Sequence, residues 1–427
     1  MYPPYFASFR RSAVLLALTA VVSAAVASPA ASVELGPPPG AVLSVEKLSR
    51  IDEFIDSEIA AGKIPGAIVL VQRHGQPVYF KTFGKRDVEK GTPMTADTIF
   101  PIHSVTKTIT SFAAMMLIDS GKIALSDPVS KYIPSFAGMK VGVERKDETG
   151  QPALELVPLR RPVNIEDLLL HTSGITYGFY GEGLVKKAYQ GIYLGDFDNA
   201  GFAERISRLP LAEQPRTLWD YGHSIDVLGR VIEVASGQSL YQFEKTHLLD
   251  PLGMTTTKFF LTDPDERARY AQPLARDRHV ERNSLDITRW ESGGGGMVST
   301  ISDFARYGQM LLNGGMLDGK TYLSPAAYAA MTTDHIGPGS GVARNYFYYP
   351  GDGFGFGYGY GVRTDPGNAV PPPPGSLGEI KWDGATGVYI VVDRAQDMFF
   401  VLMENSPSGR MHVQVTLKKI VYDAFGK

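Results

Sequence analysis

The sequence of 427 residues contains no cysteine. This absence excludes disulfide bridges, thiolate nucleophiles, iron–sulfur clusters and cysteine-rich zinc sites. An excess of charge of one sign is also missing, because 42 Lys and Arg stand against 45 Asp and Glu and no long run of either sign occurs. Since phosphate backbones are bound by clustered positive charge, we expect no nucleic-acid partner.

Long apolar runs are missing as well, except at the N-terminus. There, an arginine pair precedes an apolar stretch of roughly fifteen residues, 13–27, which ends in small residues typical of a cleavage site. A retained membrane helix is the alternative, but a span needs about 20 apolar residues. We therefore expect a signal peptide over residues 1–27. The arginine pair lacks the bulky apolar residues that favour the twin-arginine route, so ordinary secretion is expected.

Export of this kind predicts a periplasmic or secreted protein with no stable membrane anchor after processing. A Pro-rich linker, residues 28–43, follows the signal peptide. Both ends of the remaining chain then contain β-branched or alternating runs that predict strands, whereas the middle has apolar residues at helical spacing. We therefore predict a sheet domain and a helix-rich domain, and we expect the two ends of the chain to share one sheet. The predicted domains are residues 44–104 with 292–427 for the sheet, and residues 105–291 for the helices.

The strands are predicted at residues 67–73, 77–82, 359–363, 388–393 and 399–403. The first two read as an antiparallel hairpin, because a tight turn with glycine joins them. Helices are predicted at residues 45–61, 106–118, 165–170, 202–206, 227–235, 240–248, 302–312 and 413–424.

Two tetrapeptides match the pattern S-x-x-K, one beginning at Ser44 and the other at Ser104. Ser44 starts an amphipathic helix, where serine is a common N-cap. Ser104 precedes a helix whose run at residues 112–118 is apolar on every side, which is typical of a buried helix. Because three residues make nearly one helical turn, Ser104 and Lys107 share a face and can hydrogen-bond.

Burial of Lys107 would lower its pKa, and the neutral amine could then take the proton of Ser104. The alternative is a helix cap with a lysine that extends to solvent. Two later segments contain further candidates. Tyr221, in the segment WDYGHS, carries a phenol that can shuttle protons, and the small residues of KWDGATG at 381–387 allow a ligand to approach the backbone.

The order and spacing of these elements resemble the serine β-lactamase and penicillin-binding protein superfamily, specifically its class C-like branch, which includes family VIII carboxylesterases. The S-x-x-K, Y-S-x and W-x-G elements of that family would correspond here to Ser104 with Lys107, Tyr221 with His223, and Trp382 with Gly384. Stretches at residues 125–134, 164–175 and 293–315 are also similar to the family. The resemblance implies an α/β (α+β) β-lactamase-like fold, with an antiparallel sheet flanked by helices and an inserted helical domain.

The resemblance further implies that Ser104 is the acylated nucleophile and that Lys107 and Tyr221 transfer protons. The backbone N–H groups of Ser104 and Ala385 would form the oxyanion hole, and water would hydrolyse the acyl-enzyme. No cofactor and no metal are expected, since the histidines lack a spacing such as H-E-x-x-H. The implied partner is a small-molecule ester, amide or β-lactam substrate.

Two departures from the family pattern bear on the substrate. Trp382 stands where β-lactamases carry a lysine that helps to recognise the substrate carboxylate, and Lys381 would point to the opposite face of its strand. His223 replaces an asparagine, and neutral histidine offers one donor and one acceptor. The residues expected to contact substrate are Tyr177, His223, Trp382, Asp383 and Gly384.

The tryptophan favours a carboxylesterase for small neutral esters. A β-lactamase or a D-amino-acid-specific peptidase of the penicillin-binding type is an alternative that needs a cation elsewhere. A catalytically silent binding protein on the same scaffold is an alternative of another class. The sequence does not choose among acyl or alcohol groups, and resemblance of fold does not supply a substrate.

Overall fold

The computed structural model describes residues 37, 41–278, 285–345 and 347–426. The expected signal peptide lies outside the described residues, as does most of the expected linker. Contacts group the chain into two units, Met1–Val33 and Glu34–Lys427, and all described residues belong to the second. Within the described ranges, no helix has the length and apolar character that a membrane crossing requires.

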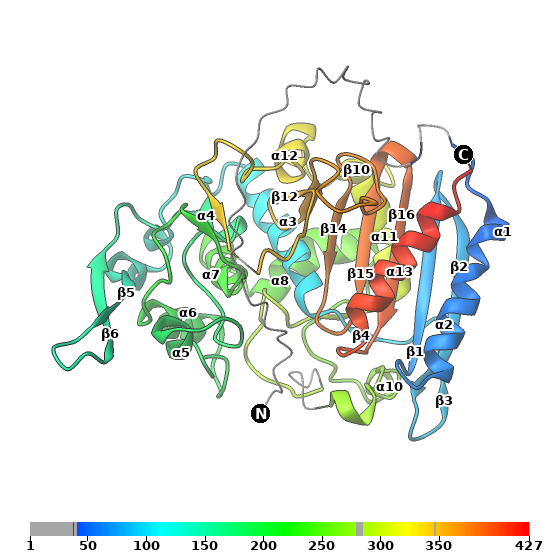
Figure 1. Ribbon diagram of the computed structural model, residues 1–427, viewed down its shortest axis with the longest axis horizontal. Helices are drawn as coiled ribbons and strands as arrows, with labels where there is room; N and C mark the ends of the chain where they lie inside the picture. Colours follow the sequence, from blue (N-terminus) through cyan, green and yellow to red (C-terminus); the bar gives the residue numbers. More distant parts are fainter. Residues whose placement is uncertain (1–36, 38–40, 279–284, 346, 427) are drawn as a thin grey trace, which may run out of the picture. The chain divides into compact units, whose positions relative to one another are not determined.

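An antiparallel sheet of eight strands is the largest element, in the order β12-β13-β14-β15-β16-β1-β2-β3 (Figure 1). Strand β1 pairs with β16 from Ala67 to Arg73 and with β2 from Gly66 to Arg73, so segments from both ends of the chain share one sheet, as predicted. The predicted antiparallel sheet, built from both ends of the chain, is thereby confirmed. The strands are β1 (Gly66–Arg73), β2 (Gln76–Asp87), β3 (Thr92–Pro93), β12 (Phe354–Phe356), β13 (Gly361–Arg363), β14 (Ile380–Asp383), β15 (Tyr389–Asp393) and β16 (Met398–Glu404).

Helices cover both faces of this sheet (Figure 1). Side chains alternate along a strand, so in β16 Phe400 and Leu402 pack with α2 and α13, whereas Phe399 and Val401 pack into the larger core around α3. Burial on both faces explains why β16 has a continuous apolar run. The helices concerned are α1 (Val45–Leu48), α2 (Arg50–Ala60), α3 (Thr106–Asp119), α11 (Ile301–Leu312) and α13 (Arg410–Asp423).

The larger core extends from the sheet into the helical region, where Leu168 and Val227 belong to the same cluster as Phe399. Helix α3 lies within this core and contacts α7 and α8. The remaining helices are α4 (Ile165–Leu169), α5 (Leu184–Ala188), α6 (Asn199–Ser207), α7 (Ser224–Ser236), α8 (Leu240–Glu244), α9 (Asp250–Leu252), α10 (Pro264–Ala268) and α12 (Pro325–Met331). The expected domain boundaries remain a prediction.

A hairpin in the helical region was not predicted. It consists of β5 (Lys140–Lys146) and β6 (Pro152–Pro158), and most of its side chains are exposed. Apolar residues alternate only briefly in each strand, at Val141 and Val143 and at Leu154 and Leu156, and this pattern is too short to indicate a strand. The turn is held by Asp147, whose carboxylate accepts hydrogen bonds from the backbone N–H groups of Thr149 (2.8 Å) and Gln151 (2.9 Å).

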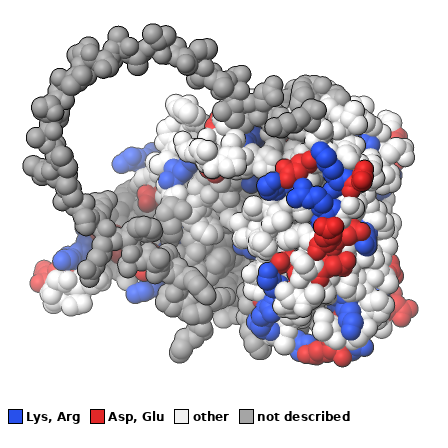
Figure 2. All heavy atoms as spheres, turned by 45° about the vertical axis from the view of Figure 1, so that its right-hand side comes forward, with Lys and Arg blue, Asp and Glu red and all other residues white. Residues whose placement is uncertain are grey.

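Short paired segments connect the larger elements. Strand β4 (Phe100–Pro101) pairs with β8 (Val298–Ser299), and this pair leads directly into the functional site. The others are β7 (Leu218–Trp219) with β11 (Ala343–Arg344), and β9 (Met316–Leu317) with β10 (Lys320–Thr321). Charges of both signs are interspersed on the face shown in Figure 2, in line with the balanced composition.

Candidate active site

Ser104 lies in a single helical turn, η1 (His103–Val105), between β4 and α3. His103 adopts a φ of 41°, a left-handed conformation that non-glycine residues rarely take. The sharp change of direction there carries the chain from the β4–β8 pair into α3. Helix α3 is buried on all sides from Thr106 to Met115, as predicted, and Lys107 is only 1% exposed.

The Lys107 ammonium makes three contacts. It donates hydrogen bonds to the Oγ of Ser104 (3.3 Å), to the hydroxyl of Tyr177 (3.0 Å) and to the carbonyl oxygen of Gly294. Burial lowers the pKa of Lys107 to about 8, although the Asp226 carboxylate acts in the opposite direction. Since deprotonation near neutral pH is accessible, this amine can accept the proton of Ser104.

The phenol of Tyr221 lies on the other side of the lysine. The Lys107 Nζ is 4.8 Å from the centre of its ring, and the ring also packs at 5.5 Å against Trp382. Burial raises the pKa of Tyr221, and the Ser104 hydroxyl and the Trp382 indole only partly oppose that rise. Tyr221 is therefore a neutral phenol at neutral pH, suited to pass on a proton, whereas Lys107 is suited to remove one.

His223 and Asp226 form a support behind the lysine. The Asp226 carboxylate lies 2.9 Å from Nδ1 of His223 and accepts hydrogen bonds from the Ser292 hydroxyl (2.6 Å) and the Gly294 N–H (3.0 Å). The carbonyl of Gly294 in turn accepts a hydrogen bond from Lys107. His223 also packs edge-on against Tyr177 at 4.5 Å. The histidine thus contacts the site through Asp226 and Tyr177.

The turn after β14 provides the second backbone segment of the site. Gly384 packs so closely on the chain before Ser104 that a Cβ would collide with the carbonyl oxygen of Ile102. The turn is closed by hydrogen bonds from Gly384 N to Val388 O (2.7 Å) and from Gly387 N to Gly384 O (3.0 Å). Within the described residues, neither the Ala385 N–H nor the Ser104 N–H is paired with a carbonyl. Both donors are therefore available to an oxyanion.

The two faces of β14 separate the candidate substrate residues. Trp382 belongs to the large core and faces Tyr221, whereas Lys381 points the opposite way, with its Nζ 3.9 Å from the centre of the Phe354 ring. Asp383 shares the face of Lys381, accepts a hydrogen bond from the Tyr349 hydroxyl and lies 3.5 Å from Arg410. Asp383 is thus bound to α13 and the Tyr349 loop.

The structure therefore brings five of the candidate side chains together: Ser104, Lys107, Tyr177, Tyr221 and Trp382. Gly384 and Ala385 border this group through the backbone, His223 supports it, and Asp383 lies apart from it. Sequence reasoning missed the role of the Gly294 carbonyl and of its link to Asp226. The glycine run at 293–296 was the available signal, since glycine permits close approach of a backbone to other groups.

No three His, Asp or Glu side chains within the described ranges gather closely enough to hold a metal ion. A half-buried serine hydrogen-bonded to a buried lysine at the start of a helix, a neighbouring phenol and two free backbone donors together define a serine hydrolase. The family model described as Beta-lactamase matches residues 51–421, and the chain belongs to this family.

The chain is also similar to individual proteins along most of its length. Protein Rv1367c of Mycobacterium tuberculosis is 36% identical over 365 residues, which are 81% of this chain and 87% of that protein. Esterase EstB of Burkholderia gladioli is 29% identical over 407 residues, covering 88% and 95% respectively. Among solved structures, EstCE1, described as a hydrolase with promiscuous acyltransferase activity, superposes with a TM-score of 0.72 at 26% identity, covering 89% of this chain and 98% of its own.

Proposed function

We propose that this protein is a secreted carboxylesterase that hydrolyses small, uncharged acyl esters through an acyl-enzyme on Ser104. The observation that carries the proposal is the orientation of β14. Trp382, not a lysine, faces Tyr221 and the nucleophile, and the neighbouring Lys381 points away. An indole offers apolar surface and a single donor, so it favours a neutral substrate over a carboxylate.

The surroundings of the nucleophile support the same substrate class. Aromatic rings border the lysine, since its Nζ lies 5.6 Å from the centre of the Tyr177 ring and 4.8 Å from that of Tyr221. Phe179 extends this aromatic surface by stacking on Tyr177 at 4.5 Å. Asp383 and Arg410 neutralise one another on the far face of β14. The similarity to esterase EstB and to the hydrolase EstCE1 agrees with ester chemistry.

The proposed reaction has two steps. Neutral Lys107 accepts the proton of Ser104 as Oγ attacks the ester carbonyl, and the N–H groups of Ser104 and Ala385 stabilise the oxyanion. Tyr221 donates its proton to the departing alcohol and is reprotonated from Lys107. A water molecule then attacks the acyl-enzyme carbonyl and gives a proton to Lys107. The same groups pass that proton to the Oγ of Ser104 as its bond to the acyl group breaks and the carboxylic acid leaves.

Labelling with a fluorophosphonate, followed by intact-mass analysis, tests the nucleophile. We expect a single adduct on the mature protein and none on Ser104→Ala. Ser44→Ala is a matched control, because Ser44 begins the other S-x-x-K match and accepts a hydrogen bond from the Lys47 N–H as the cap of α1. An adduct that persists in Ser104→Ala, or none on folded wild-type protein, would contradict the proposal.

A substrate panel then tests the chemical class. We expect faster turnover of p-nitrophenyl butyrate than of the anionic β-lactam nitrocefin or a peptide ending in D-alanine. A preference for nitrocefin would instead indicate a β-lactamase. Addition of an alcohol acceptor measures acyl transfer, the second activity named for EstCE1. The secretion part of the proposal predicts a periplasmic product whose mass corresponds to a chain that begins at residue 28.

A further inference from the structure

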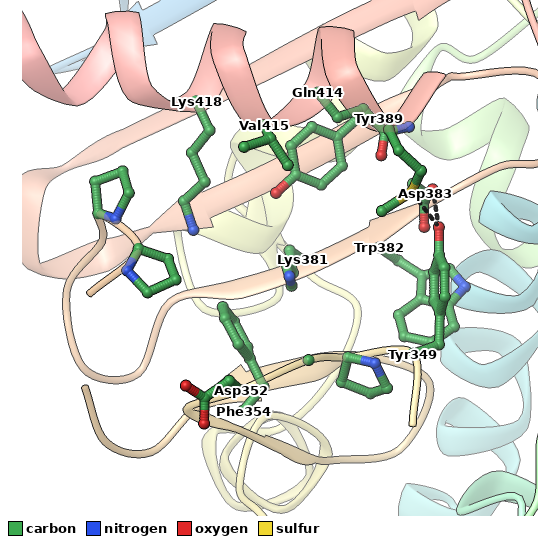
Figure 3. Close-up of a pocket in the computed structure, with 15 residues that line it drawn as sticks. Tyr349, Asp352, Phe354, Lys381, Trp382, Asp383, Tyr389, Gln414, Val415 and Lys418 are labelled. Atoms are coloured by element: carbon green, nitrogen blue, oxygen red, sulfur yellow. Dashed lines mark hydrogen bonds between the residues drawn. The ribbon is translucent and has the colours of Figure 1, made fainter. Parts of the chain in front are cut away.

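A cavity lies on the face of β14 opposite to the nucleophile (Figure 3). Its volume is about 200 Å³, and it is enclosed by β14, by helix α13 and by the segments at residues 349–354 and 373–374. Neither Ser104, Lys107 nor Tyr221 lines it. The residues that matter for its chemistry are Phe354, Lys381, Tyr389, Val415 and Lys418.

Lys381 supplies a cation without a counter-ion. Figure 3 shows its side chain directed into the space between β14 and Phe354, and its Nζ lies 3.9 Å from the centre of the Phe354 ring. Among the described residues, no Asp or Glu oxygen lies within 4.0 Å of this nitrogen, and no hydrogen bond holds it. The ring face stabilises the charge only in part.

Lys418 and Asp383, two other charged side chains that line the cavity, are each paired with an opposite charge, and a third, the exposed Asp352, accepts hydrogen bonds from the backbone N–H groups of Asn368 and Ala369. The Lys418 ammonium donates to the buried Glu379, which also accepts a hydrogen bond from Tyr422 (3.0 Å). Asp383 is held by Tyr349 and Arg410, as described above. Among the described residues, Lys381 is therefore the cation lining the cavity that has no carboxylate partner. The buried Arg363 behind the wall also lacks one, but its guanidinium donates to the carbonyl oxygens of Pro366 and Pro373.

A neutral donor accompanies this cation. Tyr389 of β15 lies directly opposite Asp383 of β14 in the strand register, so these two side chains point to the same face of the sheet. Lys381 is two residues before Asp383 and therefore shares that face. Figure 3 shows its hydroxyl directed toward the cavity. Burial raises the pKa of Tyr389 far above its ordinary value, so its hydroxyl keeps its proton and can donate a hydrogen bond.

The remaining wall is apolar. It consists of the Phe354 ring, the side chain of Val415 and the prolines at 373 and 374. The Arg363 guanidinium holds the proline segment in place, because its NH2 donates to the carbonyl oxygen of Pro373 (2.8 Å). The cavity is smaller than the roughly 300–1,000 Å³ of drug-sized sites.

We propose that this cavity, whose wall shares Trp382 and Tyr349 with the surroundings of the catalytic site, is a second binding site on the opposite face of β14, for a small organic monocarboxylate with an apolar body. The carboxylate pairs with Lys381 and accepts a hydrogen bond from Tyr389, and the body packs on Phe354 and Val415. Lys381, the lining cation with no carboxylate oxygen within 4.0 Å among the described residues, can pair with one negative charge, and the apolar wall disfavours an inorganic dianion such as phosphate. This inference does not depend on the substrate of Ser104.

Binding at this site should depend on pH in a defined direction. Burial and the charges of Lys418 and Arg363 lower the pKa of Lys381 to about 8, opposed by Glu379 and Asp383. A bound anion stabilises the ammonium, so affinity is retained at pH 7 and lost as the pH rises above about 8. Between pH 7 and pH 9.5 the loss should be about thirtyfold.

Calorimetric titration of the mature protein with benzoate and with butanoate tests the site. The protein is first labelled on Ser104 with a fluorophosphonate, so that the catalytic site is blocked. We expect saturable binding of at least one acid and none of benzamide or inorganic phosphate. We also expect a change in tryptophan fluorescence, because Trp382 reaches the cavity wall.

Three variants make the test specific. Lys381→Met should weaken binding at least tenfold, whereas Lys320→Met should not, although Lys320 also lies over an aromatic ring, that of Tyr322 at 4.9 Å. Lys381→Arg should bind at pH 7 and keep its affinity at pH 9.5, since arginine stays protonated. This third variant decides the question if Lys381→Met fails to fold. The proposal is wrong if neither acid binds, if benzamide or phosphate binds equally well, or if Lys381→Met binds as the wild type does.

Discussion

The pH dependence of turnover should report the burial of Lys107. The pKa of this lysine falls from 10.5 to about 8 because α3 holds it in the core. At pH 7 that shift raises the neutral fraction of the amine about 300-fold, to about one molecule in ten, at a cost of about 3 kcal/mol for the protonated form. We therefore expect kcat/KM for p-nitrophenyl butyrate to rise about tenfold from pH 6 to pH 7, about fivefold from pH 7 to pH 8, and to level off above pH 8.

The same reasoning predicts the effect of removing the amine. Lys107→Met should lower kcat by about 10² to 10⁴-fold, the usual contribution of a general base, and should abolish the rise toward pH 8. Lys47→Met is the matched control, because Lys47 is the exposed lysine of the other S-x-x-K match. A wild-type profile that is flat from pH 6 to 8, or an unchanged profile in folded Lys107→Met, would refute the role of Lys107 as the base.

Three further substitutions test other parts of the site. Tyr221→Phe should reduce kcat at least about 100-fold with little change in KM, since the ring packing is kept and only the proton relay is lost; steady-state kinetics will show whether KM rises instead. Trp382→Lys should raise the ratio of nitrocefin turnover to ester turnover, measured with the two substrates separately. An unchanged ratio would show that Trp382 does not determine the preference for neutral substrates. Gly384→Ala should abolish labelling by fluorophosphonate, because the added Cβ meets the carbonyl of Ile102; labelling at the wild-type rate would contradict the described turn.

Much of the fold could be predicted because its elements have a clear pattern of burial. The predicted strand at 67–73 corresponds to β1 (Gly66–Arg73), and the predicted helix at 302–312 to α11 (Ile301–Leu312). The predicted strand at 77–82 was too short, since β2 continues to Asp87. Its last residues are polar and partly exposed, so the pattern ends before the hydrogen-bonded ladder does.

Within the site, local geometry was predictable and long-range contacts were not. The spacing of Ser104 and Lys107 along one helix is sufficient to predict their hydrogen bond, which the structure contains. The contact of Lys107 with Gly294 joins residues far apart in sequence, and no local pattern encodes it. The position of Asp383 away from the nucleophile could have been predicted from the sequence. Strand alternation, which correctly placed Lys381 on the face away from Trp382, also places Asp383 on that face.

The position of β1 within the large sheet has a consequence for how the chain folds. Its two neighbours are β2, which follows at once, and β16, which is synthesised about 330 residues later. Until β16 has been synthesised, the backbone groups along one edge of β1 are unpaired, and the strand has apolar side chains on both faces. Such a strand favours pairing with other chains. The native state therefore has high contact order, and we expect slow refolding and aggregation of any chain that ends before β16.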